Sequence, residues 1–468
     1  MILQLTPKIF FLRLKSKIVS LFRKKPVPKK PPLTPETLFQ KLKAQIIFLY
    51  YTQFVFVKTK TEKRQIPRFF LGLTPIINNK HWANAIRKQG YSAINICTEI
   101  PIINSASDFD QTLSQLFPIE GEKDYYKVLI QKLKLMAYIL ENFDILIMSF
   151  RFNILSDTPF WDKEAKILKE RGIKTVIIPY GSDFYMYSKV IDQSMKHNLM
   201  INVANETFNE KDIEEKAFYW RNNADFIMMG FMVDAAGRWN CLPTSPLCID
   251  SDNWNRLKPR SLANGKNGLV TIAHTPNHRG FKGTEFIIRA INELKEEGFK
   301  VELILIEKMQ NSEVKRILQE EADILVEQLI FSGYALSGIE GMAVGIPVMS
   351  NLDRSDIVQV FRRYSYLNEC PILSTTPETL KDNLKLLITN PDLRETLGRA
   401  GREYVFKYQS YDAFGSLINE VVKKIWHDED VDTMNFYNPQ KSDSYNNSIP
   451  LIKHPLINSS YFTQETYQ

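Results

Sequence analysis

A single glutamate stands in a run of small residues in the second half of the chain. Residues 332–348 read SGYALSGIEGMAVGIPV, with Glu340 among glycines and alanines. A helix that begins near Ser337 or Gly338 would bring its N-terminal amides and this carboxylate to the ligand edge of a sheet, where glycines let backbone and ligand approach closely. Hydroxyl groups bind carboxylates and phosphates bind amides, so the pattern suits a nucleoside diphosphate. A carboxylate that only balances the helix dipole fits the pattern equally well.

A second stretch, AHTPNHRGFKGTEFII, gathers basic side chains just before a predicted helix. The preceding strand ends near His274, the loop carries His278, Arg279 and Lys282, and Gly283 opens the helix. Cations beside a helix N-terminus form an anion site that is well matched to a diphosphate. The two histidines could instead bind a metal ion, but a proline-containing loop does not hold helical i, i+4 geometry and no acidic third ligand is near in the sequence. We therefore expect no metal and no cofactor.

An acidic residue in the first half is a third candidate. Asp183 follows the apolar run in KTVIIPYGSD. Near a cleft it could orient a substrate hydroxyl or stabilise positive charge. It could equally well cap a helix that begins in FYMYSKVI.

The elements that must position these residues follow a strand–helix–strand pattern. From residue 67, short apolar runs such as RFFLGL and FDILIMSF alternate with amphipathic stretches, and a second such series starts near residue 268 with GLVTIAH. This alternation predicts parallel sheets covered on both faces. Residues 242–268 are rich in Pro, Asn, Ser and Gly and are typical of a linker. We expect an α/β protein with two Rossmann-like doubly wound domains that face each other across a cleft, where ligands bind beyond the carboxyl ends of the strands.

The predicted organisation has four parts. They are a basic amphipathic extension at 1–66, a first Rossmann-like domain at 67–258, a second at 259–426 and a flexible tail at 427–468. The tail is rich in Asn, Ser and Tyr without any period, which is typical of a mobile or partner-docked segment.

The basic residues are concentrated at the start of the chain. The formal net charge is +7, yet residues 1–69 hold sixteen Lys or Arg and two acidic residues, so the remainder is acidic. This distribution argues against nucleic acid as a partner, because a phosphate-binding groove would need positive charge on the folded domains. The four cysteines are widely scattered, which suits a reducing compartment.

Residues 1–30 combine apolar and basic side chains at helical spacing. No apolar run there, nor the run Ile46–Val57, reaches the roughly twenty residues of a spanning helix. The pattern predicts a helix that lies on an anionic membrane surface, so that the protein is cytoplasmic and peripheral at the inner face of the membrane. A solvated basic tail, or a helix docked on a protein partner of unknown identity, remains open.

The stretches HTPNHRGFKGTEFIIRAINELKEEGFKVELILIE and ADILVEQLIFSGYALSGIEGMAVGIPVM resemble the nucleotide-sugar-binding domain of the retaining glycosyltransferases of family 4, which have the GT-B fold, in a bacterial polysaccharide-type branch. The resemblance covers roughly residues 268–426 and extends more weakly to 67–258, which would be the acceptor domain. It implies that Glu340 binds the ribose and that Lys282, helped by Arg279, binds the donor phosphates. The implied donor-binding residues are His274, Arg279, Lys282, Ser332, Gly333, Tyr334, Gly338 and Glu340. The implied catalytic residues are Tyr180, Asp183, Arg279 and Lys282.

Two positions depart from the pattern of the family. Ser332 stands where many relatives have a first glutamate, which contacts the donor sugar. Tyr180 stands where relatives often have histidine, and a phenol with an ordinary pKa near 10 is a poorer base at neutral pH.

The resemblance implies a metal-independent, hexosyltransferase-like enzyme. It would move a sugar, with retention, from a nucleotide-sugar donor to a lipid-linked or glycan acceptor in polysaccharide synthesis. The departures leave open a catalytically weak or inactive relative that acts as a membrane-associated assembly subunit. An epimerase or phosphorylase on the same fold is a third possibility.

Overall fold

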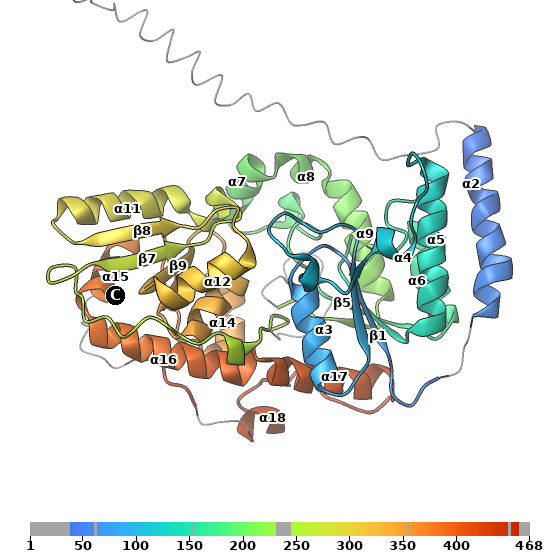
Figure 1. Cartoon of the computed structure of the whole chain (residues 1–468). Helices are drawn as coiled ribbons and strands as arrows, with labels where there is room; N and C mark the ends of the chain where they lie inside the picture. Colours follow the sequence, from blue (N-terminus) through green and yellow to red (C-terminus); the bar gives the residue numbers. More distant parts are fainter. Residues whose placement is uncertain are drawn as a thin grey trace, which may run out of the picture.

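The structure is a computed structural model that describes residues 38–59, 63–151, 153–230, 245–353, 355–447 and 451–457. These residues form two α/β domains that lie side by side, with the last long helix running beneath the first domain (Figure 1).

The first domain is built around a parallel sheet of six strands in the order β3-β2-β1-β4-β5-β6. The strands are β1 (Phe69–Leu73), β2 (Ala93–Cys97), β3 (Gln111–Thr112), β4 (Ile145–Met148), β5 (Lys174–Ile177) and β6 (Phe226–Ile227). Every residue of β1 is buried, as expected of a central parallel strand with helices on both faces. The strand order is that of a Rossmann-like sheet, and it reverses between β1 and β4.

Helices cover both faces of this sheet. They are α3 (Asn78–Lys88), α4 (Leu113–Leu116), α5 (Tyr125–Asn142), α6 (Glu164–Glu170), α7 (Gln193–Asn202), α8 (Ala204–Phe208) and α9 (Glu210–Asn223). Phe70 and Leu146 pack on the side of α5 and α9. Phe69 and Ile145, one residue earlier in each strand, pack on the side of α3, because successive side chains of a strand point to opposite faces.

The second domain has a parallel sheet of five strands in the order β11-β10-β9-β7-β8. The strands are β7 (Val270–His274), β8 (Val301–Leu305), β9 (Ile324–Gln328), β10 (Val348–Ser350) and β11 (Leu373–Ser374). The helices are α10 (Arg279–Lys282), α11 (Thr284–Glu296), α12 (Asn311–Glu320), α13 (Leu336–Val344), α14 (Ser355–Tyr364), α15 (Leu380–Thr389) and α16 (Pro391–Tyr408). Core clusters on the two faces enclose the sheet on both sides. The structure confirms the predicted α/β fold class with two Rossmann-like doubly wound domains.

Helix α17 (Tyr411–Ile425) returns the chain to the first domain (Figure 1). Its apolar stripe, which includes Phe414 and Leu417, shares a core cluster with Trp82 of α3. The rings of Trp82 and Phe414 stack with their centroids 6.4 Å apart. This helix therefore fastens the two domains together.

The segment after α17 differs from the flexible tail that the sequence predicts. In the described residues 427–447 and 451–457, the side chains of Tyr437, Tyr445 and Ile452 are buried against the second domain. This part includes the short helix α18 (Asp443–Asn446). The sequence does not reveal this packing, because the aromatic side chains of the segment have no regular spacing. Each of them fills a separate gap on the surface of the second domain.

A buried carboxylate helps to hold this segment in place. Glu369 accepts hydrogen bonds from Lys407 Nζ at 2.8 Å, from the Tyr408 hydroxyl at 2.9 Å and from the backbone N–H of Ile452 at 3.2 Å. The docked segment thus donates a hydrogen bond to the buried carboxylate of the Glu369–Lys407 ion pair, which would otherwise have fewer partners in the interior.

The N-terminal extension is described only from residue 38 onward, so the predicted membrane-binding segment 1–30 lies outside the described residues. Helix α2 (Leu38–Tyr50) continues into a π-helical turn (Tyr51–Val55) and a 3₁₀ turn (Phe56–Lys58) beside α5. Across the part of the chain that the structure describes, no helix is both long and apolar enough to cross a membrane.

Candidate functional site

The second sheet reverses its strand order between β7 and β9. Strand β7 pairs with β8 on one side and with β9 on the other. The chain therefore adds its strands first on one side of β7 and then on the opposite side. In open α/β sheets, ligands bind at the carboxyl ends of such neighbouring strands. Lys282 follows β7, Glu327 lies near the end of β9, and α13 begins after β9. The topology therefore brings these groups to the expected ligand edge.

Glu327 is the centre of the polar network at this edge, and its side chain is fully buried. Its Oε1 accepts hydrogen bonds from Lys282 Nζ at 2.6 Å, from the N–H of Ala335 at 3.1 Å and from Ser337 Oγ at 3.2 Å. Its Oε2 accepts from Ser350 Oγ at 3.2 Å. One carboxylate thus connects the basic loop, the start of α13 and strand β10. No sequence motif signals the role of Glu327.

Lys282 is buried and its ammonium group is engaged by the protein itself. Besides Glu327, it donates to Gln328 Oε1 at 3.0 Å. Gly283, with φ of +73°, then adopts a left-handed conformation that lets the chain pass from α10 into α11. An incoming phosphate would therefore share this ammonium with Glu327 or displace the carboxylate from it.

Glu340 lies in the second turn of α13 and is half-buried. Its carboxyl makes no hydrogen bond or ion pair with any residue that the structure describes. Burial is the main cause that raises its pKa, the negative charge of Glu327 adds to it and Lys282 opposes it, so that the pKa is about 8. A second carboxyl placed beside Glu327 without a partner of its own is a group available to a ligand.

The small residues of the motif let α13 approach strand β9. A Cβ atom on Gly338 would lie 3.0 Å from Glu327 Oε2 and 3.2 Å from Tyr334 Cβ. A Cβ atom on Gly341 would lie 2.5 Å from Leu325 Cδ2. The glycines that the sequence analysis assigns to close ligand approach are thus required first for packing the helix against the sheet.

Arg279 does not join Lys282 at the predicted phosphate site. Its exposed guanidinium pairs with Glu285 at 2.8 Å and with Glu307 at 3.0 Å. Glu285 lies in the first turn of α11 and Glu307 follows β8. These two carboxylates hold the guanidinium away from the buried cluster.

Two of the donor-binding residues implied by the family resemblance are core residues. His274 is fully buried, with Nδ1 2.7 Å from Val326 O and Nε2 2.9 Å from Thr284 Oγ1, and burial lowers its pKa to about 4. The hydroxyl of the buried Tyr334 lies 2.9 Å from that of Tyr404. Both side chains point inward and link elements of the domain, and their part in donor binding stays a prediction.

The loop before α13 is fastened to the end of β10. The N–H of Gly333 donates to Asn351 O at 2.7 Å, and Ser332 Oγ lies 3.4 Å from the same oxygen. Gly333 has φ of +123°, which favours glycine at this bend. Ser332 and Gly333 therefore lie in the anchored loop that leads into the cluster.

Asp183 connects two loops of the first domain. It is fully buried and accepts the N–H groups of Phe150 at 3.0 Å, Tyr180 at 3.0 Å and Gly181 at 2.9 Å. Burial raises its pKa to about 6, although the three hydrogen bonds oppose the rise. No helix begins directly after it. Asp183 therefore joins the loops that follow β4 and β5 and caps no helix, and its part in catalysis stays a prediction.

The two domains meet through segments that follow the carboxyl ends of their strands. Helix α10 packs on α7, and a Cβ atom on Gly280 would lie 2.1 Å from Asn202 Nδ2. Phe281 and Phe331 pack against Met195 and Leu199 of α7. The phosphate-loop side of the second domain is therefore in direct contact with the first domain.

Tyr180 lies close to this contact. Burial, with the charge of Asp183 as a second cause, raises its pKa above the usual range for tyrosine. The negative charge of Glu206 acts to raise the pKa of both Tyr180 and His278. For His278, burial is the larger effect and lowers the pKa. The charge of Glu206 thus reaches one residue of each domain. Nothing in the sequence around Glu206 signals this, because it depends on the packing of α7 on α10.

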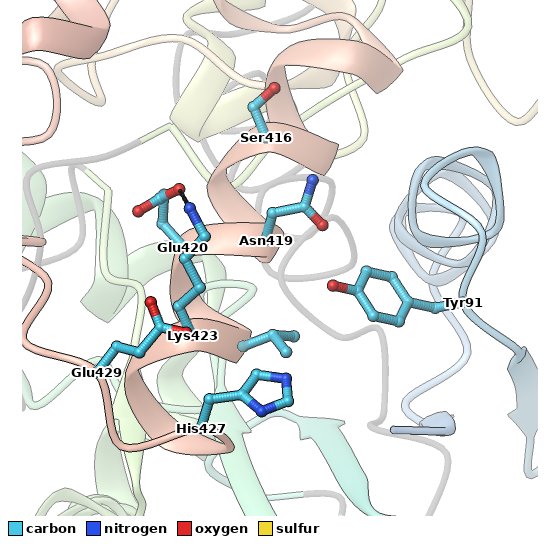
Figure 2. A pocket seen from close by; sticks show the side chains of 8 residues that line it. Tyr91, Ser416, Asn419, Glu420, Lys423, His427 and Glu429 are labelled. Atoms are coloured by element: carbon cyan, nitrogen blue, oxygen red, sulfur yellow. Dashed lines mark hydrogen bonds and ion pairs between the residues drawn. The ribbon is translucent and has the colours of Figure 1, made fainter. Parts of the chain in front are cut away.

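A separate pocket lies between Tyr91 and helix α17 (Figure 2). It is lined by Tyr91, Ser416, Asn419, Glu420, Val422, Lys423, His427 and Glu429. Two of these residues, Glu420 and Lys423 of α17, form an ion pair with a distance of 2.6 Å between Lys423 Nζ and Glu420 Oε1. The pocket shares no residue with the Lys282 cluster, so we do not assign the active site to it.

A metal site is not evident among the described residues, where no group of three or more His, Cys, Asp or Glu side chains is placed to hold an ion. Metal independence therefore stays a prediction.

Solved structures of three other proteins have a similar chain fold. HepE of Anabaena, in complex with UDP and glucose, is 11% identical over 77% of this chain and 100% of its own, with a TM-score of 0.49. Sucrose-phosphate synthase of Thermosynechococcus elongatus is 12% identical over 78% and 100%, with a TM-score of 0.45. A glycosyltransferase of Rickettsia africae is 14% identical over 78% and 100%, with a TM-score of 0.44. No family model and no curated protein matches the sequence.

Proposed function

We propose that the protein is a glycosyltransferase of the family 4 type, which moves a sugar with retention from a nucleotide-sugar donor to a lipid-linked or glycan acceptor. The observation that carries the proposal is the cluster of Lys282, Glu327 and Glu340 at the switch point of the second sheet. It combines a cation, an unpartnered carboxyl and a helix N-terminus at the edge where this topology binds ligands.

The donor would lie across the start of α13. The first N–H groups of a helix have no partner within it, so those of α13 and the Lys282 ammonium can bind the diphosphate. The ribose hydroxyls would donate to Glu340. Because the Glu340 pKa is about 8 in the free protein, the side chain is mostly protonated at pH 7 and must lose its proton to accept both hydroxyls.

Transfer breaks the bond between the anomeric carbon and the phosphate oxygen and forms a bond from that carbon to the acceptor oxygen, whose proton would pass to the departing phosphate oxygen. Negative charge then collects on the departing nucleoside diphosphate. Lys282 and the α13 amides would stabilise this charge, with the Lys282 ammonium shared between the diphosphate and Glu327. The phenol of Tyr180 stays protonated at neutral pH and would donate a hydrogen bond rather than act as the base.

The acceptor side would be formed by α7 and α8. Ile201 and Phe208 are exposed in this segment, close in the sequence to Glu206. Exposed apolar side chains next to a polar site suit an acceptor whose sugar is attached to a lipid. An inner-face, cytoplasmic location fits such an acceptor, and residues 1–30 would attach the enzyme to the membrane there.

A second candidate is a catalytically weak or inactive relative that serves as a membrane-associated assembly subunit. Two observations favour it. Lys282 is held by Glu327 and Gln328, and Arg279 is turned toward Glu285 and Glu307. Such a protein would bind a nucleotide weakly or without turnover.

Calorimetry with UDP- and GDP-sugars, followed by transfer assays with lipid-linked acceptors, separates the two candidates. For the enzyme, we expect donor binding and turnover that Lys282→Ala and Glu340→Ala both abolish. Glu302→Ala is the matched control, because Glu302 is exposed on β8 of the same domain. Donor binding without turnover on any realistic acceptor would favour the assembly subunit, and no binding to well-folded protein would exclude both nucleotide-dependent proposals.

A further inference from the structure

Helix α2 and the two turns after it carry apolar side chains on two opposite sides. The inner side packs on the first domain: Ala44, Phe48 and Phe56 are buried, and the ring of Phe48 stacks on Phe160 with centroids 4.0 Å apart. The Tyr126 hydroxyl of α5 donates to Gln40 O at 3.2 Å. The orientation of the helix on the domain is therefore fixed by its inner side.

The outer side presents large apolar residues to solvent, at the outer edge of the first domain (Figure 1). Their exposed fractions range from 42% for Leu49 to 85% for Leu38. The set comprises Leu38, Phe39, Leu42, Ile46, Leu49, Tyr50, Phe54 and Val57. We call these eight residues the outer face of α2. A continuous apolar face of this kind on a soluble domain marks a surface that docks on something else.

The charge around this face points to its partner. Residues 37–61 contain no Asp or Glu, whereas Lys41, Lys43 and Lys58 are exposed. The chain before this helix, residues 1–37, adds nine Lys or Arg and one acidic residue. An apolar face flanked by cations suits a bilayer with anionic headgroups, in which a helix lies flat with its apolar side chains among the acyl chains. Two copies of this face would instead bring like charges together.

We propose that the outer face of α2 inserts into the headgroup layer of an anionic membrane and fixes the orientation of the first domain on it. This site is distinct from the segment 1–30, and it does not depend on the activity of the donor site. Because the inner side of α2 is packed against α5 and Phe160, the domain is held at the bilayer by a rigid contact rather than by a tether alone.

The test uses the full-length chain with the double substitution Leu42→Glu and Ile46→Glu, both on exposed positions of a helix where glutamate is well tolerated. Leu262→Glu, an exposed leucine of the linker, is the matched control. Sedimentation with phosphatidylcholine vesicles, with and without an anionic phospholipid, measures the partition coefficient. Thermal melting checks that each variant is folded.

We expect the parent and the control to bind the anionic vesicles, and the double variant to bind roughly tenfold less or weaker still, since two carboxylates replace inserted apolar groups. Equal partition of parent and double variant would overturn the proposal and leave residues 1–37 as the attachment. Stronger vesicle binding by the double variant would also overturn it, because residues 1–37 would then cover this face in the free protein. A concentration-dependent dimer that the double variant abolishes, without vesicle binding by the parent, would identify the face as an interface between copies and overturn it as well.

Discussion

Replacing Glu340 with glutamine should make the free protein more stable. The Glu340 pKa is about 8 in the folded chain and 4.5 for a free glutamate, so at pH 7 folding requires the uptake of a proton. A carboxyl with a raised pKa contributes its full stability below pH 4.5 and loses it as the pH rises toward 8. Each unit of pH in this window costs about 1.4 kcal/mol, which gives about 3 kcal/mol at pH 7 as an upper value.

Solvent that reaches this half-buried group reduces the cost, so we expect Glu340→Gln to stabilise the second domain by about 2 kcal/mol at pH 7. For a domain of this size, that corresponds to a rise in melting temperature of roughly 4–8 °C. The difference between variant and parent should grow from pH 6 to pH 8.5, because the parent loses stability over that range and glutamine does not titrate.

Differential scanning calorimetry at several pH values measures this difference, with Glu302→Gln on the surface of β8 as the control. The same variant should bind the donor more weakly, since an amide cannot accept two ribose hydroxyls as a carboxylate does. A Glu340→Gln protein that melts lower than the parent, or a difference that does not change with pH, would refute the reasoning. It would show that the carboxylate has a partner that stabilises the fold.

Three further substitutions test the surrounding structure. Glu327→Gln should destabilise the second domain by about 3 kcal/mol, because it leaves the Lys282 ammonium unpaired. Adding Lys282→Met should recover most of this loss in urea unfolding. Equal losses of stability in the single and double variants would contradict the pairing. Gly338→Ala should cost roughly 1–2 kcal/mol and weaken donor binding, because its Cβ meets Glu327, and unchanged binding would exclude that contact. Asp183→Ala should lower the melting temperature of the first domain by removing the acceptor of three N–H groups, while donor affinity in calorimetry stays unchanged.

The sequence was sufficient to predict both sheets, because central parallel strands are continuous apolar runs and the helices between them are amphipathic. It also predicted that Lys282 and Glu340 belong to one site, since each follows a strand of the second series. Glu327 escaped notice because a glutamate at the end of an apolar run carries no local signal. Only the fold shows that a lysine forty-five positions earlier pairs with it.

The surroundings of the other predicted site residues could not be read from the sequence, because side-chain direction decides them. His274 and Tyr334 have the right chemistry beside the right loops, but packing turns both of them into the core. Arg279 is drawn to two surface carboxylates that no motif includes. Asp183 has three backbone partners that come from two different loops. Such contacts depend on tertiary neighbours, which spacing along the chain does not specify.

The most direct test of the donor site is the number of protons released when an intact nucleotide-sugar binds at pH 7. Calorimetry in buffers of different ionisation enthalpy gives this number, and such a donor has no phosphate group that titrates near neutrality. Because Glu340 is mostly protonated in the free protein and must bind the ribose as a carboxylate, we expect the parent to release close to one proton and Glu340→Gln to release none. Binding without proton release, or no binding of any nucleotide-sugar by folded protein, would contradict the assignment of this cluster as the donor site.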